Sequence, residues 1–266
     1  EFVEKLFLEL GLQTKIATSG NSRPAVLAQT EINPDRKTVL LYAHHDVQPV
    51  GDINKWETDP FNPEIINGRL FGRGSGDNKA GVVIHHEVVK ELMKDLPVNI
   101  KIFIEGEEEI GSPCMAQFLD EFNKELEADV IVIADSGNIR IGTPTVTTSL
   151  RGLVDGFIEV DQPMRPVHSG VGGGVVPDAF MVLSKIIASF HNEKGELQIE
   201  GLTSSDMDVL ELKEEEIKKI FGSEDINLFE LDSISKRLWL EPALSILAID
   251  APSTKEAVNL VIPNAK

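Results

Sequence analysis

Three short apolar runs, separated by stretches with helical spacing, limit the folds open to this chain more than any other feature. The runs cover residues 38–43 (TVLLYA), 99–105 (NIKIFIE) and 129–134 (DVIVIA). Continuous apolar runs of this length are typical of strands buried on both faces. Helices are expected at 1–10, 80–93 and 112–126, and a further strand at 25–30. This alternation predicts an α/β fold whose sheet is covered by helices on both faces.

The character of the sequence changes near residue 145. Residues 145–160 alternate apolar and polar side chains, as in a half-exposed antiparallel strand. Further strands are expected at 244–249 and 257–262, and helices at 177–190 and 210–221. We therefore expect two domains, residues 1–145 and residues 146–266.

Composition argues against several classes of protein. The 266 residues carry a net charge of −19, whereas nucleic-acid binding and attachment to anionic lipid both need a basic face. No apolar run approaches the ~20 residues of a membrane span. Cys114 is the single cysteine, so no internal disulfide can form. We expect a cytoplasmic protein, and because the first residues (EFVEKL) read like the interior of a helix, a piece of a longer one.

Histidine and acidic residues follow each of the three apolar runs. His44 and Asp46 come after the first, the run 107–109 (EEE) after the second, and Asp135 closes the third. Ligands of open α/β sheets bind at this edge of the strands. His44 and Asp46 are two residues apart, so they point the same way on an extended backbone, and the carboxylate can bind the second nitrogen of a metal-ligating His. Each signal alone is ordinary for a solvated loop; their conjunction favours a metal site.

Asp77 ends a glycine-rich turn just before the helix expected at 80–93. The common use of Asp at such a place is as a helix N-cap. The turn fails as a phosphate-binding P-loop, because the sequence NKA stands where Gly-Lys-Ser/Thr is needed. It also fails as a Gly-x-Gly-x-x-Gly fingerprint, because Asp77 occupies the third glycine position. No Gly-x-Ser-x-Gly nucleophile motif surrounds Ser75 or Ser112.

One imidazole and three carboxylates are therefore candidates to bind metal: His44, Asp77, Glu109 and Asp135. This set suits Zn²⁺ or Mn²⁺. A single tetrahedral ion can hardly use all four ligands and keep an open position, whereas two ions that share a carboxylate can. We therefore expect two divalent metal ions. The ligands themselves do not rank the metals, because availability decides as much as affinity; we expect Zn²⁺ first, with Mn²⁺ or Co²⁺ as alternatives.

The chain resembles the M20 family of di-metal peptidases and deacylases, nearest to its carnosinase and cytosolic dipeptidase branch. The matching segments run in family order: YAHHDVQP (42–49), GRLFGRGSGDNKAG (68–81), IEGEEEIGS (104–112), VIADSG (132–137), LRGLVDGFIEV (150–160) and HSGVGGG (168–174). The resemblance implies that residues 1–145 are the N-terminal part of the catalytic domain, a helix-covered mixed sheet. Residues 146–266 would be part of an inserted α+β, ferredoxin-like lid, through which the protein forms a homodimer.

The resemblance also implies roles for the candidate ligands. Asp77 would bridge both metal ions. His44 and Asp135 would complete one site, and Glu109 would belong to the other.

Three further residues take catalytic roles by the same resemblance. Glu108 matches the general base, Asp46 the partner of His44, and His168 the group that polarises the scissile carbonyl. For His168 the alternative is an ordinary loop histidine near glycines. The family also has a cis peptide bond after the bridging Asp, here between Asp77 and Asn78.

The implied activity is hydrolysis of a dipeptide or short peptide by a metal-activated water with Glu108 as base. The alternative within the class is an N-acyl amino-acid amidohydrolase, similar to desuccinylases and aminoacylases. The alternative outside it is a catalytically silent binding or dimerisation fragment. That last reading arises because the family ligates its second metal with a histidine near the C-terminus, and no histidine follows His191.

Smaller departures from the family pattern are expected to tune packing. They are Ala43 where Gly is usual, Asn78 where Asp is often found, and Ala80 where Gly is common. His85 and His86 fall within the helix expected after Asp77, and we expect them to be structural.

Overall fold

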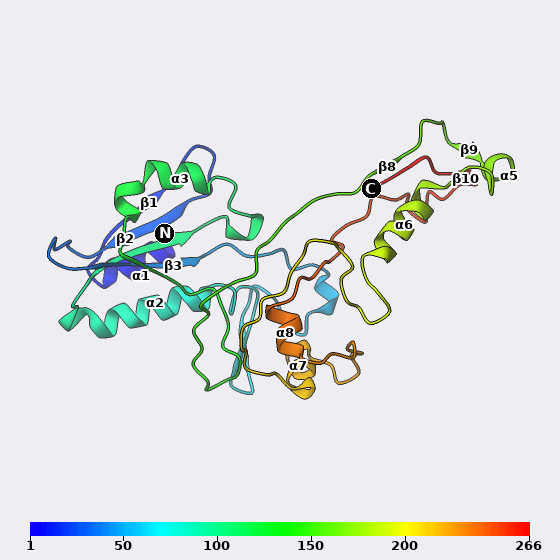
Figure 1. Cartoon of the computed structure of the whole chain (residues 1–266). Coiled ribbons are helices and arrows are strands. Elements are labelled where there is room, and N and C mark those ends of the chain that lie inside the picture. Colours follow the sequence, from blue (N-terminus) through cyan, green and yellow to red (C-terminus); the bar gives the residue numbers. More distant parts are fainter. The chain divides into compact units, whose positions relative to one another are not determined.

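The computed structural model describes residues 1–266, which divide into two compact units, Glu1–Val146 and Thr147–Lys266. Figure 1 shows the elements of both units along the chain. None of the helices has both the length and the apolar character that crossing a membrane would require.

A five-stranded mixed sheet forms the centre of the first unit. Its strands are β1 (Gln13–Ala17), β2 (Ala25–Gln29), β3 (Thr38–His44), β6 (Asn99–Glu105) and β7 (Val130–Ile133), in the order β1-β2-β6-β3-β7. β3 runs parallel to both β6 and β7, whereas β1, β2 and β6 pair antiparallel. The sequence predicted every one of these strands except β1. Because β6, β3 and β7 are parallel, their carboxyl ends lie at one edge of the sheet.

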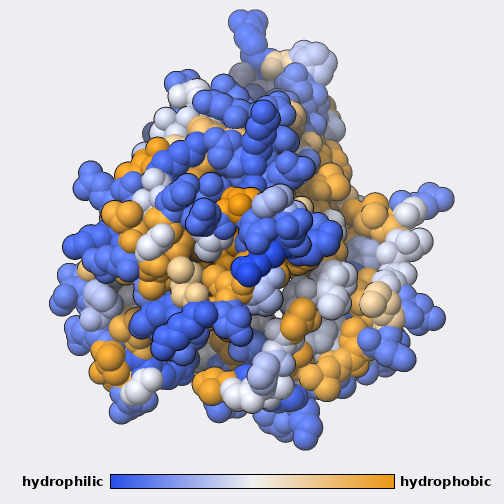
Figure 2. Space-filling model, turned by 90° about the vertical axis from the view of Figure 1, so that its left-hand side faces the viewer, coloured by the Kyte–Doolittle hydropathy of each residue, from blue (hydrophilic) through white to orange (hydrophobic).

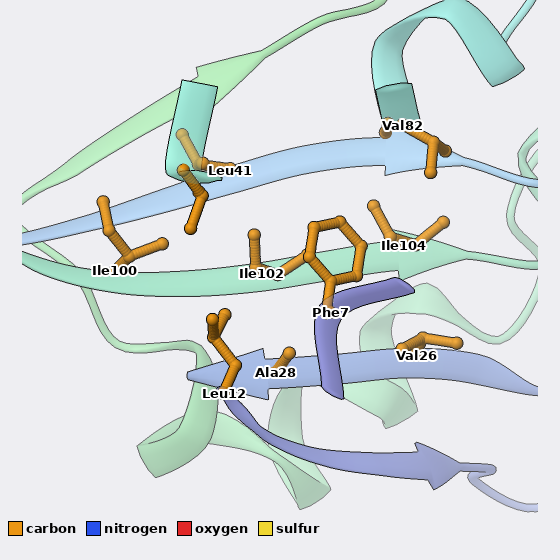
Figure 3. Close-up of a cluster of buried hydrophobic side chains, with 11 residues drawn as sticks. Phe7, Leu12, Val26, Ala28, Leu41, Val82, Ile100, Ile102 and Ile104 are labelled. Carbon is orange, nitrogen blue, oxygen red and sulfur yellow. The ribbon is translucent and has the colours of Figure 1, made fainter. Parts of the chain in front are cut away.

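Helices cover both faces of this sheet, as the sequence predicted (Figure 1). They are α1 (Phe2–Glu9), α2 (Lys79–Leu92), α3 (Met115–Glu121) and α4 (Asn123–Leu126), with short 3₁₀ turns at Ile53–Lys55, Met93–Asp95 and Glu108–Ile110. Phe7 of α1 and Val82 of α2 pack on one face with Ile102 and Ile104 of β6 (Figure 3). Phe118 of α3 packs on the other face. β6 is consequently buried along its whole length.

Strand β7 and the loop before α2 are more exposed. All four residues of β7 are exposed, between 44% and 61%. The apolar pattern predicts this strand correctly but not its exposure, because β7 lies at the edge of the sheet and has one neighbour. An exposed hairpin, β4 (Glu64–Ile66) and β5 (Arg69–Phe71), precedes α2. On the face drawn in Figure 2, hydrophobic patches lie among hydrophilic side chains.

Helix α2 is bonded to the sheet through one carbonyl group. The carbonyl oxygen of Tyr42 in β3 accepts from the imidazole Nε2 of buried His85 at 2.8 Å and from the N–H of Ala134 at 3.0 Å. Gly81, in the first turn of α2, lies so close to its surroundings that a Cβ would stand 2.1 Å from Asn78 Oδ1 and 2.2 Å from the Ala134 carbonyl oxygen. The start of α2 is thus in direct contact with Ala134, the residue that follows β7.

The second unit contains short elements around one longer helix. Its strands are β8 (Val160–Asp161), β9 (Val167–His168), β10 (Leu260–Val261) and β11 (Asn264–Ala265); its helices are α5 (Ser169–Gly172), α6 (Ala179–Ser189), α7 (Glu214–Phe221) and α8 (Ile234–Trp239). β8 pairs with β11 and β9 with β10, both antiparallel. Asp178 caps α6, and Ala179 and Leu183 pack against Ala265. The helix predicted at 177–190 is confirmed.

Two predicted strands of the second unit are wrong. Residues 145–159 and 244–249 form no strand. Residues 154–158 of the first segment and all of 244–249 instead line a cavity of about 480 Å³ together with Leu183 and Ile187 of α6. A strand needs a neighbour for its hydrogen bonds, and alternation of side chains alone does not supply one.

Gly81→Ala should destabilise the protein by about 1–3 kcal/mol, because the new Cβ overpacks the contact between α2 and Ala134. Elsewhere in a helix interior the same change stabilises by about 1 kcal/mol, so the sign is informative. Urea denaturation measures it, with Val83→Ala on the exposed side of α2 as the control. A stabilised Gly81→Ala variant would contradict the close contact.

His85 should make stability depend on pH. Burial lowers its pKa from the ordinary 6.5, and the bond to the Tyr42 carbonyl only partly opposes this. Above pH 6.5 the imidazole is neutral in the folded and the unfolded protein, and its full contribution to stability is present. As the pH falls below 6.5, the histidine of the unfolded chain becomes protonated before that of the folded protein, so the free energy of unfolding decreases. Urea midpoints between pH 7.5 and 5 should fall less for His85→Gln than for the wild type, whereas Val83→Ala, which changes no titrating group on the exposed side of α2, should follow the wild type. Parallel curves for all three would contradict it.

Candidate metal centre

His44, the last residue of β3, lies at the centre of the candidate site. Its side chain is fully buried. Its Nε2 lies 2.9 Å from Asp77 Oδ1, 3.6 Å from Asp135 Oδ1 and 3.7 Å from Glu108 Oε2. Burial lowers the pKa of His44, but the charges of the surrounding carboxylates, Asp135 first, outweigh it and raise the pKa overall. One ring nitrogen therefore faces three carboxylates that come from three different parts of the chain.

Asp46 supports both His44 and the glutamate turn. Its Oδ1 lies 3.3 Å from Nδ1 of His44. The same carboxylate accepts the backbone N–H of Glu108 at 3.2 Å and that of Glu109 at 3.1 Å. Nδ1 also lies 3.2 Å from the backbone carbonyl oxygen of Asp46, so a proton on Nδ1 faces Asp46 and leaves Nε2 available to a metal ion placed between it and the carboxylates. Asp46 thus orients the imidazole and places the two glutamates next to it.

Two groups of residues can each hold a metal ion, because within each group the potential ligand atoms lie within 4.8 Å of one another. One contains His44, Asp77 and Glu109, and the other contains His44, Glu108 and Asp135. The structure therefore brings together all four residues that the sequence proposed as ligands. His44 belongs to both groups; the assignment in which Asp77 bridges two ions stays a prediction.

The three consecutive glutamates have different surroundings. Glu107 is buried, and its carboxylate accepts the backbone N–H groups of Arg23 at 3.1 Å and Cys114 at 2.9 Å. It therefore stabilises the turn from inside. Glu108 and Glu109 face His44 instead. Burial is the main cause that raises the pKa of Glu108, and His44 opposes it.

Two amide side chains bind the candidate ligands and were not singled out by the sequence as site residues. Gln48 donates from Nε2 to Glu109 Oε2 at 2.8 Å. Asn78 donates from Nδ2 to Asp135 Oδ1 at 2.6 Å. Both lie inside the motifs that carry the resemblance, next to the proposed ligands, and that proximity was the available signal. The Asp77–Asn78 peptide bond is cis, as the resemblance implies.

His168 belongs to the second unit. There it caps α5, with Nδ1 accepting the N–H of Gly170 at 3.0 Å. Its role in polarising a substrate carbonyl stays a prediction. Of the two histidines in α2, His85 is buried and bonded to the sheet, as expected of a structural residue, and His86 bonds Glu87 at 2.9 Å.

The chemistry of these donors fits a divalent transition metal. A buried imidazole nitrogen and several carboxylate oxygens within a few ångströms are the ligands that Zn²⁺ and Mn²⁺ accept. Carboxylates so close together also repel one another unless a cation or a proton lies between them. The residues present therefore fit the metal ions that the resemblance implies.

Comparison with known proteins identifies the family to which the chain belongs, and it is the one the sequence motifs resemble. The chain belongs to peptidase family M20/M25/M40, whose family model matches residues 40–234. It is 33% identical over 266 aligned residues to a cysteinylglycine-S-conjugate dipeptidase of Corynebacterium striatum, covering 97% of this chain and 58% of that protein. It is 32% identical over 258 residues to the human Beta-Ala-His dipeptidase, covering 90% of this chain and 50% of that protein.

A solved structure supports the fold directly. The M20 family metallo-carboxypeptidase of Sulfolobus solfataricus aligns with 99% of this chain and 62% of its own chain, at 26% identity and a TM-score of 0.76. The chain thus spans between half and about three fifths of the length of these relatives.

Zn²⁺ should stabilise the protein against unfolding, because only the folded chain brings these ligand atoms together. A free concentration 100 times the dissociation constant adds about 2.7 kcal/mol. Thermal denaturation with Zn²⁺ and with a chelator measures the shift. His44→Ala should lose it, and His191→Ala, in the second unit, should keep it. Equal shifts in both variants would show that Zn²⁺ binds elsewhere.

Proposed function

We propose that this chain carries the metal-binding part of a metal-dependent dipeptidase, which hydrolyses the peptide bond of dipeptides or short peptides. The observation that carries the proposal is the convergence of Asp77, Glu108 and Asp135 on the Nε2 of His44, within 3.7 Å. Membership of the M20/M25/M40 peptidase family and the two dipeptidase relatives support the same activity.

The ligands proposed for two divalent ions, Zn²⁺ in the first place, are His44, Asp77, Glu109 and Asp135. When bound, such ions act as Lewis acids on the scissile carbonyl and make a water more acidic. Glu109 is suited to be a ligand because Gln48 holds it in place. Gln48 Nε2 donates to the Glu109 carboxylate and to its backbone carbonyl oxygen, each at 2.8 Å.

Glu108 is the proposed general base. The Asp46 carboxylate accepts the backbone N–H of Glu108 at 3.2 Å. Glu108 is therefore positioned through its main chain, while its carboxylate faces the cluster. Burial and the neighbouring carboxylates raise its pKa, which favours a group that accepts a proton and later returns it. In the proposed reaction it takes the proton of the attacking water and delivers it to the leaving amine.

The second unit is proposed to be part of the lid domain. Its α6, packed on the β8–β11 pair, supplies the α+β character. His168 would act from this domain on the substrate carbonyl. The homodimer through the lid and the cytoplasmic location implied by the resemblance stay predictions.

Glu108→Gln should lower kcat for dipeptide hydrolysis by about 10²–10⁴-fold, because it removes the proton acceptor and keeps the size of the side chain. Zn²⁺ binding should be largely retained. The measurement is steady-state kinetics on the protein that contains this chain, beside metal analysis and a Glu91→Gln control on the exposed side of α2.

Unchanged hydrolysis by Glu108→Gln would contradict its role as base. A substrate panel of dipeptides and N-acyl amino acids separates the peptidase from an amidohydrolase. Hydrolysis of the acylated compounds alone would reject the proposed substrate class. No hydrolysis of either class by a metal-loaded wild type would favour the silent binding fragment.

A further inference from the structure

Asn78 connects helix capping with the candidate metal centre. It is 1% exposed and forms the N-cap of α2. Its Oδ1 accepts the backbone N–H of Gly81 at 3.0 Å, and its Nδ2 donates to Asp135 Oδ1 at 2.6 Å. One buried amide thus bonds the start of α2 and Asp135, the second residue after β7.

The two bonds determine the orientation of the amide. If the group were turned by 180°, its oxygen would face the Asp135 carboxylate, acceptor against acceptor, and its NH₂ would face the Gly81 N–H. Only the present orientation satisfies both neighbours. An aspartate at position 78 could still cap the helix, but it has no hydrogen to donate to Asp135.

The backbone leaves little room for any other arrangement. A Cβ on Gly81 would approach Asn78 Oδ1 to 2.1 Å and the Ala134 carbonyl oxygen to 2.2 Å. Ala134 itself donates its N–H to Tyr42 of β3. The amide is therefore enclosed between α2 and the residues that follow β7, and its donor group is bonded to Asp135.

We infer that Asn78 is a positioning residue for the metal centre: its amide N–H orients the Asp135 carboxylate toward His44, while its oxygen independently caps α2. Asp135 Oδ1, the atom that accepts from Asn78, lies 3.6 Å from Nε2 of His44. Removal of groups that hold a ligand in this way costs about 10–100-fold in metal affinity or activity. The inference rests on the proposed function, because it takes Asp135 to be a ligand.

Two variants separate positioning from capping. Asn78→Ser retains a side-chain oxygen at the N-cap but is too short to reach Asp135, and it adds no charge. Asn78→Ala removes both bonds. If Asn78 positions Asp135, both variants should bind Zn²⁺ about 10–100-fold more weakly than the wild type, measured by competition with a chromophoric chelator. Only Asn78→Ala should also show the lower thermal midpoint, in the metal-free protein, that loss of a cap produces.

The opposite pattern would overturn the inference. If Asn78→Ser bound Zn²⁺ as tightly as the wild type, Asn78 would be a helix cap and nothing more. The same holds if weaker binding appeared only in Asn78→Ala, in step with its lower midpoint. A wild type that binds no Zn²⁺ would overturn the proposed function, and the inference with it. Failure of the proposed function is therefore seen in the wild type, and failure of the inference alone in the variants.

Discussion

The parallel arrangement of β6, β3 and β7 is the constraint on which the candidate site depends. Parallel neighbours end at the same edge of a sheet, so His44, the glutamate turn and Asp135 reach one place although they lie far apart in the chain. The carbonyl of Tyr42 strengthens this arrangement, since it accepts from Ala134 at the end of β7 and from His85 of α2. A shift of one residue in β3 would turn His44 to the opposite face of the sheet and away from the carboxylates.

The same convergence concentrates negative charge. In a chain with a net charge of −19, several carboxylates surround an imidazole that has no contact with solvent. Burial disfavours the charged imidazole, yet the carboxylates raise its pKa, which shows how strongly the cluster attracts a positive group. Hydrogen bonds from Asn78 and Gln48 and from backbone N–H groups hold the carboxylates in place. Such an arrangement is suited to a divalent cation, which carries a larger charge than a proton and coordinates several oxygens at once.

The spacing of apolar residues correctly predicted the elements whose burial follows a regular pattern along the chain. β6 is buried on both faces, and its continuous apolar run was sufficient to identify it. α6 was identified by its helical spacing. The spacing of apolar residues was misleading where the structure depends on which strands lie beside a segment. The apolar run of β7 implied burial, but β7 is an exposed edge strand, and residues 145–159 alternate without any neighbour to pair with.

The sequence by itself determined which ligand types are present, their order, and their position after predicted strands, because these follow from residue identity and local periodicity. Only the tertiary structure decided which side chains meet. It directs Glu107 into the turn and Glu108 toward His44, and it joins Asn78 to Asp135, 57 residues away. The reason is physical: these contacts depend on strand register and on the close approach of α2 to β7, and both are set by hydrogen bonds between distant segments rather than by the residues on either side.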